Sequence, residues 1–173
     1  MVMLDPSGGR ADGVIELSNR PHVSLAVVLP RDTMSIPVVR HLCQHALREL
    51  GSDGACAEDI GLAVTEACAN VVQHAGPGEA YRVEVDIADS ACELRVLDQG
   101  GRFVAEAAEA SVEDRARDPM SETGRGLAII RALMDDLSFE SQPARGTVVR
   151  MVKLLEFEPD APAHTLLPGT RPS

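Results

Sequence analysis

Residues 60–75, IGLAVTEACANVVQHA, carry the pattern that decides the fold class of this chain. At about 100° per residue on a helical wheel, Glu66, Asn70 and Gln73 share one face, and the opposite face is apolar. The polar face offers carboxylate, amide and imidazole groups and has no Lys or Arg. Such a row suits a hydrated cation or a polar ligand, although a plain solvated helix surface would show the same residues.

The flanking sequence predicts one arrangement of strands and helices. Alternating or β-branched apolar runs predict strands at residues 23–29, 83–87, 94–96, 137–140 and 147–155. Apolar stripes of helical period predict helices at residues 37–50, 57–75 and 127–136, and residues 104–118 are acidic, alanine-rich and helix-prone. Strands that follow each other directly pair antiparallel and leave the helices on one face of the sheet. We therefore expect a two-layer α/β sandwich with a mixed or antiparallel sheet.

The chain is long enough for one domain and two tails. A length of 173 residues supports a single substantial core, which we expect over residues 21–156. Residues 1–20 are polar and glycine-rich, and residues 157–173 are rich in proline. Both ends are therefore expected to be poorly ordered tails.

Charge and composition exclude several classes of function. The net charge of -11 argues against direct binding to nucleic acid or to anionic membranes, and favours a basic partner protein. Four cysteines without a CxxC pair, and the lack of a signal sequence or an eighteen-residue apolar run, predict a cytoplasmic protein. The sequence has no GxxxxGKS phosphate loop and no serine-hydrolase elbow. A zinc site at His41 and His45 lacks an evident third ligand, since Cys43 points elsewhere on the helix.

Two further motifs are candidates for ligand binding. Asp98, Gln99 and Gly100 close an apolar strand, where a carboxylate could accept a hydrogen bond from the exocyclic amine of a base, or could belong to a simple turn. Residues 124–127, GRGL, stand before an apolar helix. Glycines there could bring backbone N–H groups to a phosphate, or could form a hinge.

Together these motifs resemble a known family. Residues 66–75, EACANVVQHA, resemble the N-box of the Bergerat-fold ATPases, which include the histidine kinases. Residues 98–100 and 124–127 are similar to the first and second glycine boxes of that family. The short chain, the EACAN form of the N-box and the paired terminal strands with Gly146 and Thr147 resemble most the anti-sigma-factor serine kinases of the RsbW type. The resemblance covers residues 22–155.

The resemblance implies a site for ATP and Mg²⁺. By this resemblance Asp98 receives the adenine amine with support from Thr147 through water, Asn70 gives its side-chain oxygen to Mg²⁺, and Glu66 is the general base. Mg²⁺ prefers hard oxygen ligands, and phosphoryl transfer depends mainly on positioning and charge neutralisation. Nucleotide contacts are further implied for His74, Gly100, Arg102, Gly124, Arg125, Gly126 and Leu127.

One position departs from the family pattern. The first glycine box usually reads Asp-x-Gly-x-Gly, and its final glycine is replaced here by Arg102. A long cation at this place could contact the nucleotide or obstruct it.

The resemblance implies a homodimeric protein-serine kinase that sequesters a sigma factor and phosphorylates an anti-sigma-factor antagonist. The alternative is a partner-switching binding module in which nucleotide binding is weak or lost, and Arg102 favours this alternative. Glu66 favours the kinase, because a module that only binds nucleotide needs no base there.

Overall fold

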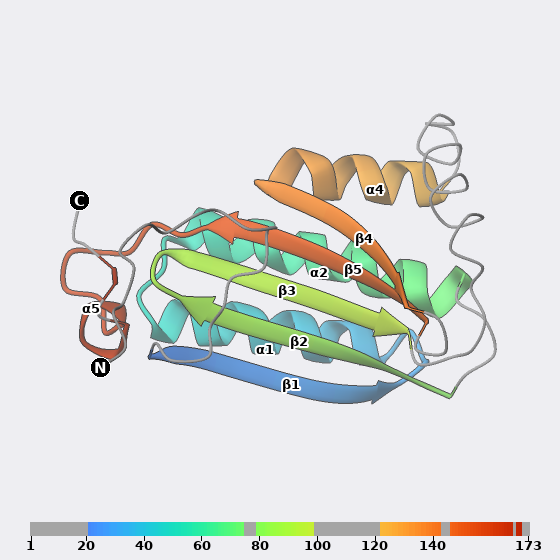
Figure 1. The fold of residues 1–173 in the computed structure, drawn as a ribbon, viewed down its shortest axis with the longest axis horizontal. Helices are drawn as coiled ribbons and strands as arrows, with labels where there is room; N and C mark the ends of the chain where they lie inside the picture. Colours follow the sequence, from blue (N-terminus) through green and yellow to red (C-terminus); the bar gives the residue numbers. More distant parts are fainter. Residues whose placement is uncertain (1–20, 75–78, 99–121, 143–145, 168, 171–173) are drawn as a thin grey trace, which may run out of the picture.

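The computed structural model describes residues 21–74, 79–98, 122–142, 146–167 and 169–170. Its five strands form one sheet in the order β1-β2-β3-β5-β4, and every neighbouring pair is antiparallel (Figure 1). The strands are β1 (His22–Pro30), β2 (Ala80–Ala88), β3 (Ala91–Asp98), β4 (Asp136–Gln142) and β5 (Gly146–Leu154). The helices are α1 (Ser35–Glu49), α2 (Gly54–His74), α4 (Glu122–Leu133) and the short α5 (Ala163–Leu166).

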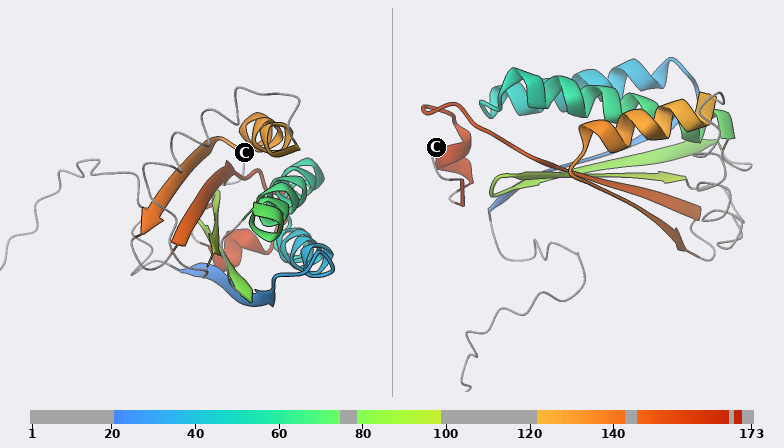
Figure 2. Two further views of the ribbon diagram at one scale, coloured as in Figure 1. Left: turned by 90° about the vertical axis from the view of Figure 1, so that its right-hand side faces the viewer. Right: turned by 90° about the horizontal axis from the view of Figure 1, so that it is seen from above.

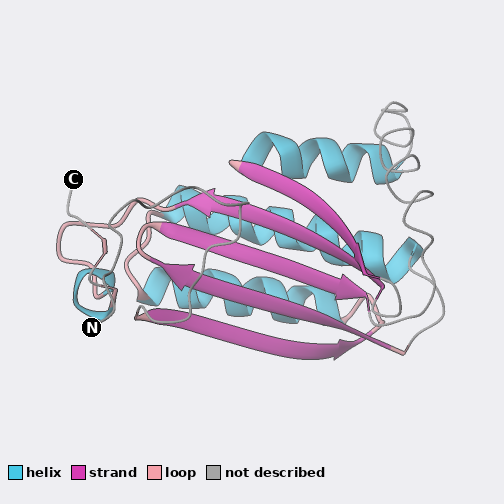
Figure 3. Ribbon diagram, viewed as in Figure 1, coloured by secondary structure: helices cyan, strands magenta, loops and turns pink. Residues whose placement is uncertain are grey.

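The three long helices cover one face of the sheet. The right-hand view of Figure 2 shows α1, α2 and α4 in a single layer above the strands, and Figure 3 distinguishes the helices from the strands by colour in the face-on view. This arrangement confirms the two-layer α/β sandwich predicted from the sequence. The expected helix at residues 104–118 and the expected N-terminal tail lie outside the described residues.

Strand register decides which side chains face the helices. On β2 the side chains of Tyr81, Val83, Val85 and Ile87 are buried and alternate with partly exposed ones. The β2–β3 pairing places Tyr81 opposite Asp98 and Val83 opposite Val96. Since directly opposite residues share a face, Asp98 is the last inward-facing residue of β3 and continues an otherwise apolar row.

Helix α1 lies close to its predicted range of 37–50, although it begins two residues earlier and ends one residue earlier. Its buried side chains include Ile36, Val39, Cys43 and Leu47, spaced three or four residues apart along one stripe. The helix is closed by Gly51, whose φ of 78° is a left-handed conformation that glycine adopts readily. A Cβ at position 51 would lie 2.6 Å from the Cβ of Ala161, so close packing also requires glycine here.

The C-terminal segment differs from the expected disordered tail. Ala161, Ala163 and Leu167 are buried in the same cluster as the helix–sheet core. Backbone hydrogen bonds join the segment to the α1–α2 turn, from Glu158 N–H to Gly51 O and from Ala163 N–H to Leu50 O. Pro159 lies in a turn and Pro162 is the N-cap of α5, and both are positions where proline is compatible with order. Residues 157–167 therefore pack as part of the folded unit.

Helix α4 also begins earlier than expected. The sequence predicted a helix after Gly124, whereas α4 starts at Glu122. Only the first four N–H groups of an α-helix lack an intrahelical partner, so Gly124 falls among them and Gly126 does not. Gly126 instead lies in the helix, where its lack of a side chain matters more than its N–H group.

Candidate functional site

The candidate residues come together at one end of the molecule. The C-terminal half of α2, the end of β3 and the starts of α4 and β5 lie at the right-hand end of Figure 1. The pairing of Leu97 with Val148 shows that β3 ends beside the start of β5. Four stretches of chain that are separated in sequence therefore meet at this end of the helix–sheet sandwich.

A cavity of about 360 Å³ opens between α2 and α4. It is lined by Glu66, Ala69, Asn70, Gln73, Arg125, Gly126 and Ile129. Glu66, Asn70 and Gln73 form the polar face that the helical wheel predicted, and α4 supplies the opposite wall. The structure thus brings Glu66, Asn70, Arg125 and Gly126 to one cavity, together with Ala69 and Ile129, which the sequence analysis did not select.

Gly126 permits the close approach of the two helices. A Cβ at this position would stand 2.9 Å from Glu66 Oε2 and 3.7 Å from both Oδ1 and Nδ2 of Asn70. A side chain here would displace the Glu66 carboxylate and would come into van der Waals contact with the Asn70 amide. The absent side chain leaves hard oxygen donors facing a bare stretch of backbone, which is a suitable chemical environment for Mg²⁺ and phosphate groups. The residues present therefore fit the Mg²⁺-nucleotide that the sequence resemblance implies.

Asp98 lies beneath the helices at the end of β3 and is 4% exposed. Arg31 donates from Nη2 to Asp98 Oδ1, and its side chain is only 10% exposed. Arg31 comes directly after β1, two strands away from β3 in the sheet. The sequence analysis did not select Arg31, because no local spacing links it to Asp98. The only available signal was that an inward-facing carboxylate at the end of an apolar strand requires a partner.

The remaining candidates are placed only in part. Gly124 lies in the first turn of α4, and Leu127 is buried in the core beneath it. His74 ends α2 and Thr147 lies near the start of β5, but their side chains are outside the described parts. Gly100 and Arg102 lie outside the described residues.

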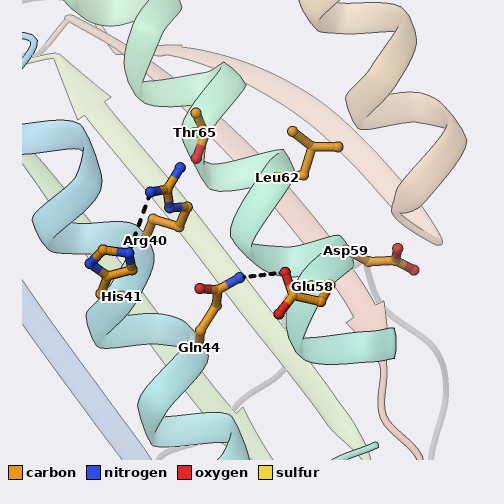
Figure 4. Close-up of a pocket in the computed structure, with 7 residues that line it drawn as sticks. All are labelled: Arg40, His41, Gln44, Glu58, Asp59, Leu62 and Thr65. Carbon is orange, nitrogen blue, oxygen red and sulfur yellow. Dashed lines mark hydrogen bonds between the residues drawn. The ribbon is translucent and has the colours of Figure 1, made fainter. Parts of the chain in front are cut away.

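A second hollow of about 450 Å³ lies between α1 and α2 (Figure 4). It is lined by Arg40, His41, Gln44, Glu58, Asp59, Leu62 and Thr65. Gln44 Nε2 donates to Glu58 Oε2 across it at 3.0 Å. Although this hollow is larger, no glycine and no helix N-terminus line it, so it lacks the features of a phosphate site. The first cavity is therefore the better candidate for nucleotide.

Metal binding through histidine and cysteine finds no support in the described parts of the chain. Cys43 is buried on the core side of α1, whereas His45 is exposed. Among the described residues, no group of three or more His, Cys, Asp or Glu side chains could hold a metal ion. Within the same residues, no helix is long and apolar enough to cross a membrane.

Comparison with known proteins identifies the class of this fold and site. Residues 29–153 match the family model of the histidine kinase-like ATPase domain. The chain belongs to the histidine kinase-like ATPase family, whose members use ATP.

The relatives include serine-protein kinases. Two proteins named Serine-protein kinase RsbW, from Bacillus velezensis and Halalkalibacterium halodurans, are each 30% identical over 75% and 77% of this chain and 84% of their own lengths. A protein named Anti-sigma F factor from Pasteuria penetrans is 33% identical over 57% of this chain and 68% of its own length. These similarities place the chain with the anti-sigma kinases of the family.

Two solved structures share the fold. The RsbU and RsbW domains of a Mycobacterium tuberculosis protein superpose with a TM-score of 0.58 at 22% identity, over 78% of this chain and 32% of that one. The SiaB–SiaC complex from Pseudomonas aeruginosa gives a TM-score of 0.61 at 16% identity, over 78% of this chain and 91% of the matched chain. At these identities the likeness concerns the fold alone.

Proposed function

We propose that this protein is an ATP-dependent protein-serine kinase that sequesters a sigma factor and phosphorylates an anti-sigma-factor antagonist on serine. The observation that carries the proposal is the placement of Glu66 and Asn70 on one face of α2, directly against Gly126 of α4. A module that only held nucleotide would need the metal ligand but not the carboxylate beside it.

Four of the candidate residues have a chemical role in this proposal. The Asn70 side-chain oxygen would hold Mg²⁺, which supplies charge neutralisation for the triphosphate. Glu66, one helical turn away, would accept the proton of the attacking serine hydroxyl. The N–H of Gly124, at the N-terminus of α4, would donate to a phosphate oxygen. Asp98 would accept a hydrogen bond from the exocyclic amine of adenine.

The choice of partners rests on charge and on the relatives. A net charge of -11 suits a partner with a basic surface. Relatives named as serine-protein kinase RsbW and as anti-sigma F factor support a sigma factor and its antagonist as the partners. A homodimer is expected from the same resemblance.

A second candidate function is a non-catalytic partner-switching module. Arg102, at the place of the final glycine of the first glycine box, favours it. In such a module the complex with sigma factor would form, but no phosphate would reach the antagonist.

Two measurements separate these functions. Calorimetric titration with ATP, with and without Mg²⁺, tests the site itself. Incubation with Mg-ATP and a panel of antagonist domains, followed by mass spectrometry, tests transfer. The kinase proposal expects phosphoserine with wild type and a decrease of about a hundredfold or more in the rate with Glu66→Ala. A stable partner complex in which no antagonist ever gains phosphate would leave the binding module as the function.

A further inference from the structure

The ion pair between Arg31 and Asp98 joins the ends of strands β1 and β3, at positions that are 67 residues apart in the sequence. Arg31 N–H donates to Glu79 O at 2.9 Å, which extends the β1–β2 ladder by one step beyond Pro30. Neighbouring strands lie roughly 4.8 Å apart, so β1 and β3 are separated by roughly 10 Å. The guanidinium therefore reaches past the start of β2 to meet the carboxylate.

The position of Tyr81 explains why the Arg31 side chain lies on the helix-facing side of the sheet. It pairs with Leu29 on one side and with Asp98 on the other, and all three residues share the inward face. Arg31 is the next inward position after Leu29 along the first strand. The cation and the carboxylate thus lie at the boundary between the apolar core and the open end of the sandwich.

Burial makes the pair chemically consequential. The two side chains are 10% and 6% exposed, and a buried polar group is costly unless it is hydrogen-bonded, so the contact with Arg31 holds the Asp98 carboxylate in place. A carboxylate group accepts hydrogen bonds through its oxygens, as the carbonyl of a base also does. It has room for about four such bonds, so the pairing of Oδ1 with Arg31 is compatible with a further donor.

We propose that Arg31 is a positioning residue that selects the purine through Asp98. By pairing with Oδ1, Arg31 holds the Asp98 carboxylate in one orientation, so that its oxygens meet the base as hydrogen-bond acceptors and the site favours a base that offers an exocyclic amine over one that offers a carbonyl at the same place. The inference rests on the proposed function, because it takes Asp98 to be the residue that meets the base.

The test compares ATP with inosine triphosphate, which has a carbonyl where ATP has its amine. Calorimetry with Mg²⁺ gives the ratio of the two affinities in wild type, Arg31→Met and Arg31→Lys. We expect wild type to prefer ATP by about tenfold or more, and Arg31→Met to lose about tenfold of that preference. Arg31→Lys keeps the charge without the guanidinium fork and should retain part of the preference for ATP.

Arg150→Met is the matched control. Arg150 has an 11% exposed side chain and pairs with the buried Glu93, but it lies on the opposite face of the sheet. The Arg150→Met substitution therefore removes a comparably buried cation without touching the site. The preference for ATP over inosine triphosphate should stay at the wild-type value.

A double-mutant cycle separates positioning from general support of the fold. With Asp98→Asn as the background, Arg31→Met should not change the ratio further, because the residue through which it acts has gone. If Arg31→Met does not fold, as judged by circular dichroism, the Lys variant and an Arg31→Gln variant provide the comparison.

The outcomes distinguish the two proposals. A wild-type protein that binds neither nucleotide overturns the proposed function and this inference with it. A wild-type protein that prefers ATP, with Arg31 variants that keep the full preference, overturns the role of Arg31 alone.

Discussion

The carboxylate of Glu66 rests against the backbone of Gly126, so that a Cβ at position 126 would stand 2.9 Å from Glu66 Oε2. This contact joins the polar face of α2 to the second turn of α4. Because the obstructing atom would be the end of a flexible side chain, a substitution there would move the carboxylate before it moved the backbone. The position of the proposed base thus depends on a residue that has no side chain of its own.

Gly126→Ala should separate activity from stability. Alanine is favoured over glycine inside a helix by about 1 kcal/mol, and this gain offsets the cost of moving the Glu66 side chain, so the free energy of unfolding should change little. Displacement of Glu66 should lower phosphate transfer to the antagonist by about tenfold or more, since small misplacements of catalytic groups are costly. Gly54→Ala, with no atom within 4 Å of the new Cβ, is the control and should leave transfer unchanged. Equal transfer by both variants would contradict this reading of the contact.

Asn70→Ala should remove the contribution of magnesium to ATP binding. In wild type, calorimetric affinity should be higher with Mg²⁺ than with EDTA, because a divalent ion joins the amide oxygen to the phosphates. Without that oxygen the two affinities should converge. Gln73→Ala, on the same wall of the cavity, should preserve the difference. A magnesium effect of full size in Asn70→Ala would remove Asn70 from the metal site.

Leu167→Ala should destabilise the protein by about 2–5 kcal/mol, the usual cost of emptying a buried leucine position. Its side chain is 1% exposed, whereas that of the neighbouring Leu166 is 53% exposed. Leu166→Ala should therefore change the free energy of unfolding by no more than about 0.5 kcal/mol. Urea denaturation of both variants measures the difference. Equal, small effects would mean that the C-terminal segment does not belong to the cooperative core.

The buried thiols should make stability fall at alkaline pH. Burial raises the pKa of Cys43 and that of Cys68 from 9.0 to about 12. Between these values the unfolded chain releases thiol protons that the folded chain keeps, so the free energy of unfolding decreases as pH rises from about 9 towards about 12. Urea denaturation at pH 8 to about 10.5 should show a shallower decline for Cys68→Ala than for wild type. Parallel declines would contradict the assignment.

Local patterns account for the part of the site that the sequence predicted. Glu66 and Asn70 are four residues apart, and this spacing alone places them on one face of a helix. Asp98 follows an alternating strand, whose period puts it on the buried side. The cavity therefore holds several residues that the sequence selected, although their chemical roles remain predictions.

Long-range contacts account for what the sequence did not predict. Arg31 contacts Asp98 because β1 and β3 both pair with β2 in the folded sheet. No local pattern in the intervening sequence indicates this contact. The order of the C-terminal segment depends on the space that Gly51 leaves for Ala161, which proline content does not indicate. The start of α4 was misplaced because the glycines suggested a boundary that the helix passes through.

The packing of the C-terminal segment has a practical consequence for work with shortened versions of this protein. The family match ends at residue 153, yet Leu155, Ala161, Ala163 and Leu167 belong to the same apolar cluster as α1 and α2. An expression boundary drawn at residue 153 would remove the segment that packs against one end of α1 and α2, and apolar side chains of these helices would then face water. The unit to produce, crystallise or fuse to a reporter extends through Thr170, which is buried and whose hydroxyl donates to Leu167 O.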